Sequence, residues 1–284
     1  MSALPLTAAR ATPRAAPGSA CRAVAGPAEA ARTLWALTGW SAALLLAFAA
    51  AALVDARSLA GESVWLKPSK FALSFVLLYA TMALVVERLS SSARTGLAMR
   101  ATLAVMIAAT AVEMAYIAAQ AARGVPSHFN LATPFEAAMY SVMGVGAVAL
   151  VAGIGIVGTL AARDRAAGLG AGLRAGVRWG FVLSALLTFG VAGTLGSQGS
   201  HFVGTPSPDA ATLPLLGWSA EVGDLRPAHF LALHAMQVLP LFGWWLDRRG
   251  AAPQPSMGLA AAGWTALTAA VFVQALLGMP LLRL

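Results

Sequence analysis

The sequence contains very little charge. Aspartate, glutamate, lysine and arginine make up 11% of its 284 residues, whereas soluble domains contain about a quarter. Hydrophobic residues make up 59%. A chain of this composition has too few polar side chains to cover a globule in water, so lipid is the solvent that it implies. The scarcity of charge therefore predicts an integral membrane protein.

Cysteine is almost absent, because Cys21 is the only one. A single thiol excludes an intramolecular disulfide and a cysteine-based zinc or iron–sulfur site. No apolar run precedes Cys21, which argues against a lipoprotein signal. The sequence also has no Walker phosphate loop and no Gly-x-Ser-x-Gly elbow. These absences argue against a transport ATPase.

The apolar residues form seven segments that can each cross a hydrocarbon core of about 30 Å. They are residues 34–54, 65–86, 101–122, 134–160, 179–195, 227–246 and 258–281. Residues 1–33 are rich in Ala, Pro and Arg, which predicts a disordered basic tail. We therefore expect an all-α fold, a polytopic transmembrane helix bundle over residues 34–284 with a long outer loop at 198–226.

Lysine and arginine predict the orientation, because cytoplasmic loops are enriched in them. One side of the predicted bundle has thirteen of the nineteen basic residues: Arg10, Arg14, Arg22, Arg32, Arg88, Arg94, Arg100, Arg163, Arg165, Arg174, Arg178, Arg248 and Arg249. The pattern predicts a cytoplasmic N-terminus and an outer C-terminus. The net charge of +8 lies in short loops rather than on one face, so no nucleic-acid partner is expected.

All four histidines fall on the predicted outer side. His128 follows the third segment, His201 follows the fifth, and His229 and His234 lie at the start of the sixth. Imidazole is a common ligand of metals and haem, although a single interfacial histidine is more often a snorkelling or capping residue. His229 and His234 are about 140° apart around a helix, so at most one of them points into a shared site.

Other polar residues lie on the same side. Glu113, Tyr116 and Gln120 share one face of the third segment. An ionisable group at mid-helix costs about 2.5–3.5 kcal/mol and usually faces a bundle interior or a wet cavity. We therefore predict a polar pocket in the outer leaflet. Its other members are Lys67, Lys70, Glu136, Asp224, Arg226, Gln237 and Gln274.

Several of these residues also have a simpler interpretation. Asp224 is a candidate cap for the helix that follows it, and Lys67 and Lys70 are candidate anchors to lipid headgroups. The fourth segment contains five glycines, which are typical of close helix packing in lipid. They are Gly144, Gly146, Gly153, Gly155 and Gly158.

Four short strings, at residues 65–71, 127–130, 223–230 and 233–240, together resemble an uncharacterised family of bacterial multi-pass membrane proteins. The resemblance covers roughly residues 34–281. It implies a seven-helix architecture and a location in the inner membrane. It implies no activity.

The leading functional hypothesis is a cofactor protein, most simply a b-type haem protein that exchanges electrons with a membrane redox partner. His234 and His201 are the candidate ligands of haem or a transition metal, with His128 and His229 as alternatives. Glu113 and Gln237 would then surround the cofactor or relay protons.

Three alternatives stay open at this point. In a small transporter or receptor, Glu113, Arg226 and Lys70 would bind a small solute or a proton. In a metal-dependent membrane hydrolase, histidines would act with Asp224 or Glu136. The fourth reading is a structural subunit of a larger complex, so the sequence leaves open whether the protein is an enzyme.

Overall fold

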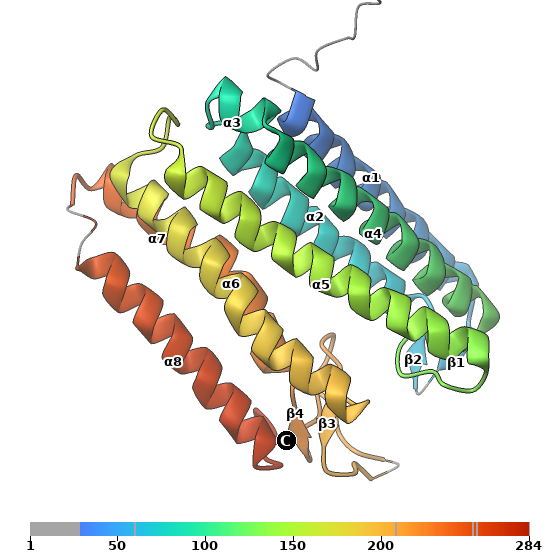
Figure 1. Cartoon of the computed structure of the whole chain (residues 1–284). Helices are drawn as coiled ribbons and strands as arrows, with labels where there is room; N and C mark the ends of the chain where they lie inside the picture. Colours follow the sequence, from blue (N-terminus) through green and yellow to red (C-terminus); the bar gives the residue numbers. More distant parts are fainter. Residues whose placement is uncertain (1–28, 60, 208, 252, 254, 284) are drawn as a thin grey trace, which may run out of the picture.

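The computed structural model describes residues 29–59, 61–207, 209–251, 253 and 255–283, so most of the predicted tail lies outside the described residues. The described part contains seven long helices and no extended sheet (Figure 1). The long helices are α1 (Glu29–Val54), α2 (Leu66–Val86), α4 (Leu97–Arg123), α5 (Pro134–Arg163), α6 (Ala171–Gln198), α7 (Arg226–Arg248) and α8 (Ser256–Leu276).

The remaining elements are small, and the sequence analysis did not predict them. Helix α3 (Ser91–Thr95) lies between α2 and α4. Strand β1 (Ser58–Leu59) pairs with β2 (Glu62–Ser63), and β3 (Phe202–Val203) pairs with β4 (Gly223–Asp224), both antiparallel. Each pair closes a connection between two long helices.

The connections divide the bundle into two ends (Figure 1). The links α1–α2, α4–α5 and α6–α7 and the C-terminal segment lie together, and we call this the histidine end. The links α2–α4, α5–α6 and α7–α8 lie at the other end, which we call the arginine-rich end. Successive long helices therefore run in opposite directions, as the alternating charge pattern requires.

Six of the described helices are long and apolar enough to cross a membrane: α1, α2, α4, α5, α6 and α8. Large apolar side chains such as Leu46, Val145 and Leu186 lie on the outside of the bundle, where lipid would cover them. Helix α7 does not meet the same criterion. The prediction of seven apolar spans is therefore confirmed for six helices. Helix α7 differs because it combines polar residues with an otherwise apolar sequence.

Several helix boundaries differ from the predicted ones. Helix α1 begins at Glu29 and α6 at Ala171, before the predicted apolar segments, because their polar first turns are helical as well. Helix α8 ends at Leu276, before the predicted 281, since Gly278 adopts a left-handed conformation with φ 74° and Pro280 follows.

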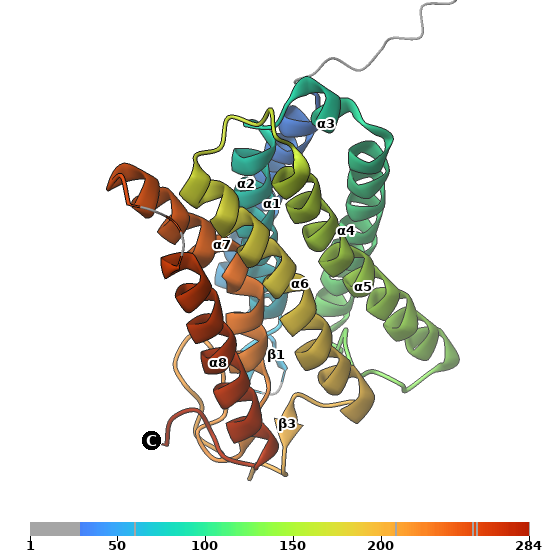
Figure 2. The same ribbon diagram turned by 60° about the vertical axis from the view of Figure 1, so that its left-hand side comes forward.

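Helices α6 and α7 approach each other through their backbones. Gly172, Gly176 and Gly180 recur every four residues along α6 and face α7. A Cβ atom on Gly176 would overlap the backbone of Leu239, and one on Gly180 would lie 2.7 Å from the carbonyl oxygen of Ala235. This small-residue stripe is the close-packing pattern of membrane helices, and Figure 2 shows the two helices side by side along their length.

The glycines of α5 have the predicted packing role at four of the five positions. Cβ atoms on Gly153 and Gly158 would overlap Met106 of α4 and Phe181 of α6. Gly155 and Gly146 also face neighbouring helices, whereas Gly144 has no heavy atom within 4 Å of a built Cβ.

The start of α6 is fixed by a carboxylate from α7. Gly172 donates its backbone N–H to Asp247 Oδ1 at 2.7 Å, and Leu173 donates to Asp247 Oδ2 at 2.8 Å. A carboxylate at this position satisfies two first-turn donors and complements the positive end of the helix dipole.

Candidate functional site

The connection between α6 and α7 folds back onto the histidine end. Asp224, in β4, organises it, and its side chain is 0% exposed. Asp224 accepts hydrogen bonds from the backbone N–H groups of Ser219 and Arg226 and from the guanidinium of Arg226 at 2.5 Å. All these bonds are internal to the loop and the start of α7. Asp224 therefore holds the first turn of α7 in place, but it is not the predicted N-cap, because that position belongs to Leu225, which has no side-chain cap hydrogen bond.

Two cations attach this loop to the helices beneath it. Arg226 donates to the carbonyl oxygen of Gly217 at 2.6 Å. Lys70 donates to the carbonyl oxygen of Leu216 at 3.2 Å and lies 3.6 Å from Glu62. The ammonium of Lys70 thus belongs to the attachment of the loop.

Four of the predicted residues gather beside this loop, and we call them the cationic cluster: Lys67, His128, His201 and Arg226. They come from α2, the α4–α5 connection, the α6–β3 connection and α7. Burial and the positive charge of Lys67 lower the pKa of His128 to about 3. Burial and the charges of Arg226 and Lys67 lower the pKa of His201 to about 4, although Asp224 acts in the opposite direction. Both imidazoles are therefore neutral at physiological pH.

Phenylalanine rings surround the cluster. The Phe71 ring lies 5.4 Å from that of His128, and the Phe129 ring lies 6.3 Å from that of His201. The guanidinium of Arg226 lies 5.3 Å from the centre of the Phe202 ring. The sequence analysis did not select these residues. The repeated His-Phe pairs at residues 128–129 and 201–202 were the available signal.

Phe129 adopts an unusual backbone conformation with φ 55°. Left-handed backbone at a bulky residue is rare and costs about 1–3 kcal/mol. Its ring contacts those of His128, His201 and Tyr140. The strained conformation therefore places an aromatic ring next to both imidazoles, and such strain is concentrated at functional sites.

His229 and His234 have different surroundings. The His234 ring stacks on Phe230 at 3.9 Å, and its Nδ1 lies 2.8 Å from the carbonyl oxygen of the same residue. His229 Nδ1 is buried without a hydrogen-bond partner. Across the described ranges, no three His, Cys, Asp or Glu residues are grouped so that they could hold a metal ion. The predicted shared metal site thus gains no support, and haem ligation stays a prediction.

A second set of predicted residues links α4 to α5. Gln120 donates to the hydroxyl of Tyr116 at 3.0 Å, and Arg123 donates to Gln120 at 2.6 Å. Arg123 also lies 3.3 Å from Glu136, whose carboxylate accepts a hydrogen bond from Thr133. Glu136 N–H donates in turn to the Thr133 hydroxyl, so Thr133 is the N-cap of α5.

The remaining predicted residues lie elsewhere. Glu113 is buried on α4, one turn further into the bundle than Tyr116. Gln237 of α7 donates to Thr81 of α2 at 3.2 Å. Gln274 donates to the carbonyl oxygen of Pro280 at 2.6 Å, where it closes the end of α8. Gln274 therefore has a structural role at the C-terminal end.

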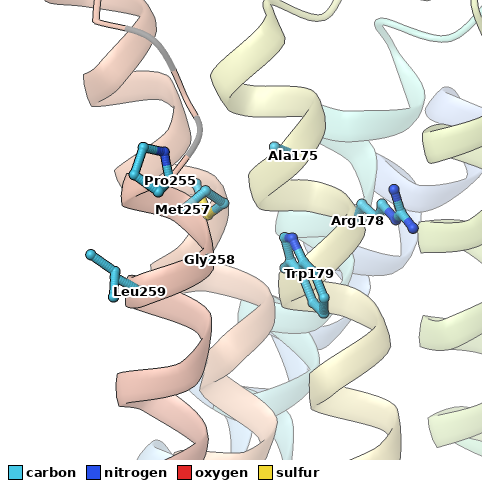
Figure 3. Close-up of a pocket in the computed structure, with 7 residues that line it drawn as sticks. All are labelled: Ala175, Arg178, Trp179, Pro255, Met257, Gly258 and Leu259. Atoms are coloured by element: carbon cyan, nitrogen blue, oxygen red, sulfur yellow. The ribbon is translucent and has the colours of Figure 1, made fainter.

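A groove of about 690 Å³ lies at the arginine-rich end between α6 and α8 (Figure 3). Trp179, Met257 and Leu259 line it, and the side chain of Arg178 extends away from α8. None of the predicted site residues lines this groove. Its apolar walls between two lipid-facing helices suit acyl chains better than a polar ligand.

The cationic cluster is therefore the strongest candidate site, and its chemistry is the only guide to its ligand. Comparisons with protein-family models, with curated proteins and with solved structures find no match to this chain.

Proposed function

We propose that this protein binds a small organic anion at its histidine end, as a membrane receptor or transporter. The observation behind the proposal is the cationic cluster, in which Lys67 and Arg226 are both close enough to His201 to lower its pKa. Asp224 balances the charge of Arg226, so the charge of Lys67 lies beside two neutral imidazoles and lacks a negative counter-charge among the described residues. A carboxylate is the simplest group that supplies it.

The charges of the cluster support an anion. Asp224 neutralises Arg226, but the ammonium group of Lys67 has no hydrogen bond or ion pair with any described residue. Lys67 and Arg226 also lie in the first turns of α2 and α7. First-turn N–H groups and the positive ends of helix dipoles favour negative ligands. The side chains and the backbone N–H groups therefore both favour a negatively charged ligand.

The aromatic surroundings favour an organic anion over an inorganic one. Phe71, Phe129 and Phe202 contact the imidazoles or the guanidinium of the cluster. Binding sites of this kind combine apolar walls with a few polar groups that fix orientation. A ligand with one carboxylate and an aromatic or aliphatic body matches both parts.

We further propose that α7 is a seventh crossing, with the histidine end outside and the N-terminus in the cytoplasm of a bacterium. Helix α7 has 23 residues, about 35 Å at 1.5 Å per residue, and it packs along α6 and against α8. Protein neighbours tolerate the polar face that lipid would not. The excess of arginine at the opposite end supports this orientation.

The test is anion binding to the full chain purified in mild detergent, measured by calorimetry with benzoate, acetate and inorganic phosphate as probes. We expect benzoate to bind best and Lys67→Gln to weaken it by about tenfold to a hundredfold, the value of one charge-assisted hydrogen bond. Lys70→Gln is the matched control, because its ammonium contacts Glu62 and Leu216 instead. Equal affinities in wild type and Lys67→Gln would overturn the proposal, as would the absence of binding for all three probes.

The haem and hydrolase predictions are checked on the same sample. A Soret band that changes on reduction, or a stoichiometric metal lost in His201→Ala, would replace the anion site with a cofactor site. A colourless, metal-free protein that binds benzoate would support the receptor or transporter.

A further inference from the structure

Glu113 is the most deeply placed acidic residue of the described helices. It lies on α4, ten residues before the end of the helix at Arg123, which is about 15 Å along the axis. Glu113 is 4% exposed. Its carboxyl group is therefore within the membrane-spanning part of the bundle and is covered by protein.

Helices α2 and α5 cover this carboxyl group. On α5, a Cβ built on Gly146 would lie 3.2 Å from Glu113 Oε1, so the glycine leaves room for the acid. On α2, the buried Tyr79 lies near this position, because its hydroxyl bonds to Thr110, one turn before Glu113 on α4. No lysine, arginine or histidine of the described residues forms an ion pair with Glu113.

An ionised carboxylate without a cationic partner has a high free energy in such surroundings. The cost of a charge inside the bilayer is avoided when the group holds a proton, faces water or pairs with a cation. The titratable groups one turn away are Tyr116 on α4 and, through Thr110, Tyr79 on α2, and neither is a cation. The contacts thus favour the neutral acid.

Polar side chains extend further from Glu113 toward the histidine end than toward the other end. Tyr116 and Gln120 follow at successive turns and are joined by a hydrogen bond of 3.0 Å, and Arg123 and Glu136 continue the line to the histidine end. In the other direction, Thr110 bonds to Tyr79, and beyond this pair Met106 and Met99 are fully buried. The longer polar line favours proton access to Glu113 from the histidine end.

We propose that Glu113 is a proton-binding site inside the membrane domain, open to the histidine end through the α4–α5 interface. The site stands on observations separate from the cationic cluster. Combined with the proposed anion site, a proton site in the same domain would allow transport of an anion together with a proton.

The first test uses the wild-type chain and dicyclohexylcarbodiimide, which reacts with protonated carboxyl groups in apolar surroundings. Peptide mass spectrometry should find Glu113 labelled at least about tenfold more than the exposed Glu62 and Glu87, consistent with its burial. The labelling should fall as pH rises. The proposal would be overturned if Glu113 were not labelled, or if its labelling did not change with pH.

The second test is infrared difference spectroscopy between about pH 6 and a higher pH, because ordinary carboxyl groups, with pKa values of about 4, are already ionised in this range and give no C=O band. The C=O band of a neutral carboxylic acid should disappear at high pH in the wild type and be missing in Glu113→Gln. Glu87→Gln is the control, because Glu87 is exposed and lies outside this line, and it should keep the band. A band that survives Glu113→Gln would contradict the assignment, and the labelling result decides the matter if that variant does not fold.

Discussion

Replacing Gly176 with alanine should separate α6 from α7. The added Cβ atom would overlap the carbonyl oxygen of Leu239 and lie 2.8 Å from Pro240 Cα. Both neighbours are backbone atoms of a helix, so neither can rotate away, and the helix axes must move apart by roughly 1 Å, since ordinary packing needs about 3.5 Å between carbon atoms. Overpacking of this kind costs about 1–3 kcal/mol.

The control is Gly193→Ala on the same helix, where a Cβ meets no heavy atom within 4 Å. That change should leave stability unchanged or raise it by up to about 1 kcal/mol, because alanine has the higher helix propensity. Unfolding in mixed micelles, followed by circular dichroism, measures both variants against wild type. If Gly176→Ala is as stable as Gly193→Ala, the backbone contact between α6 and α7 is refuted.

Two further predictions concern the ends of the bundle. Asp247→Asn should destabilise the protein by about 0.5–2 kcal/mol, because one of the two N–H groups of Gly172 and Leu173 loses its acceptor and the other keeps only an uncharged one. The same unfolding assay measures this change, and an unchanged midpoint would contradict the cap. The pKa values of His128 and His201 lie below their ordinary value of 6.5, at about 3 and about 4, so the unfolded chain binds protons that the folded chain does not. Stability should therefore fall as pH drops from 6.5 towards 4, and these two histidines should add no pH dependence above 6.5. The unfolding free energy of His128→Asn should depend less on pH than that of wild type, and an identical dependence would refute the assignment.

The helices were predictable from the sequence because apolar runs of sufficient length have few other solutions. Helix α7 shows the limit of that argument, since its polar residues are stabilised by neighbouring helices that hydropathy does not include. The sequence analysis selected the glycines of α5 and overlooked those of α6. The spacing of four residues between Gly172, Gly176 and Gly180 was a visible signal of a tight interface.

The site was only partly predictable. Lys67 and Lys70 are three residues apart and chemically identical, but only the loop geometry shows that Lys70 is bound to Leu216 and Glu62. Asp224 was a candidate member of the polar pocket, and its complete burial and its hydrogen bond from Ser219 depend on how the long loop folds. Contacts between segments far apart in the chain decide these roles, and a single sequence does not encode such contacts in any local pattern.

The glycine contact between α6 and α7 also has a mechanical consequence. Side chains that interdigitate can exchange rotamers and slide, but two backbones in direct contact have nothing between them to rearrange. Helices α6 and α7 are therefore expected to move as one rigid body. Two hydrogen bonds of the described residues join this body and its connecting loop to α2, from Gln237 to Thr81 and from Lys70 to the carbonyl oxygen of Leu216. A movement of the body relative to α2 would have to break both.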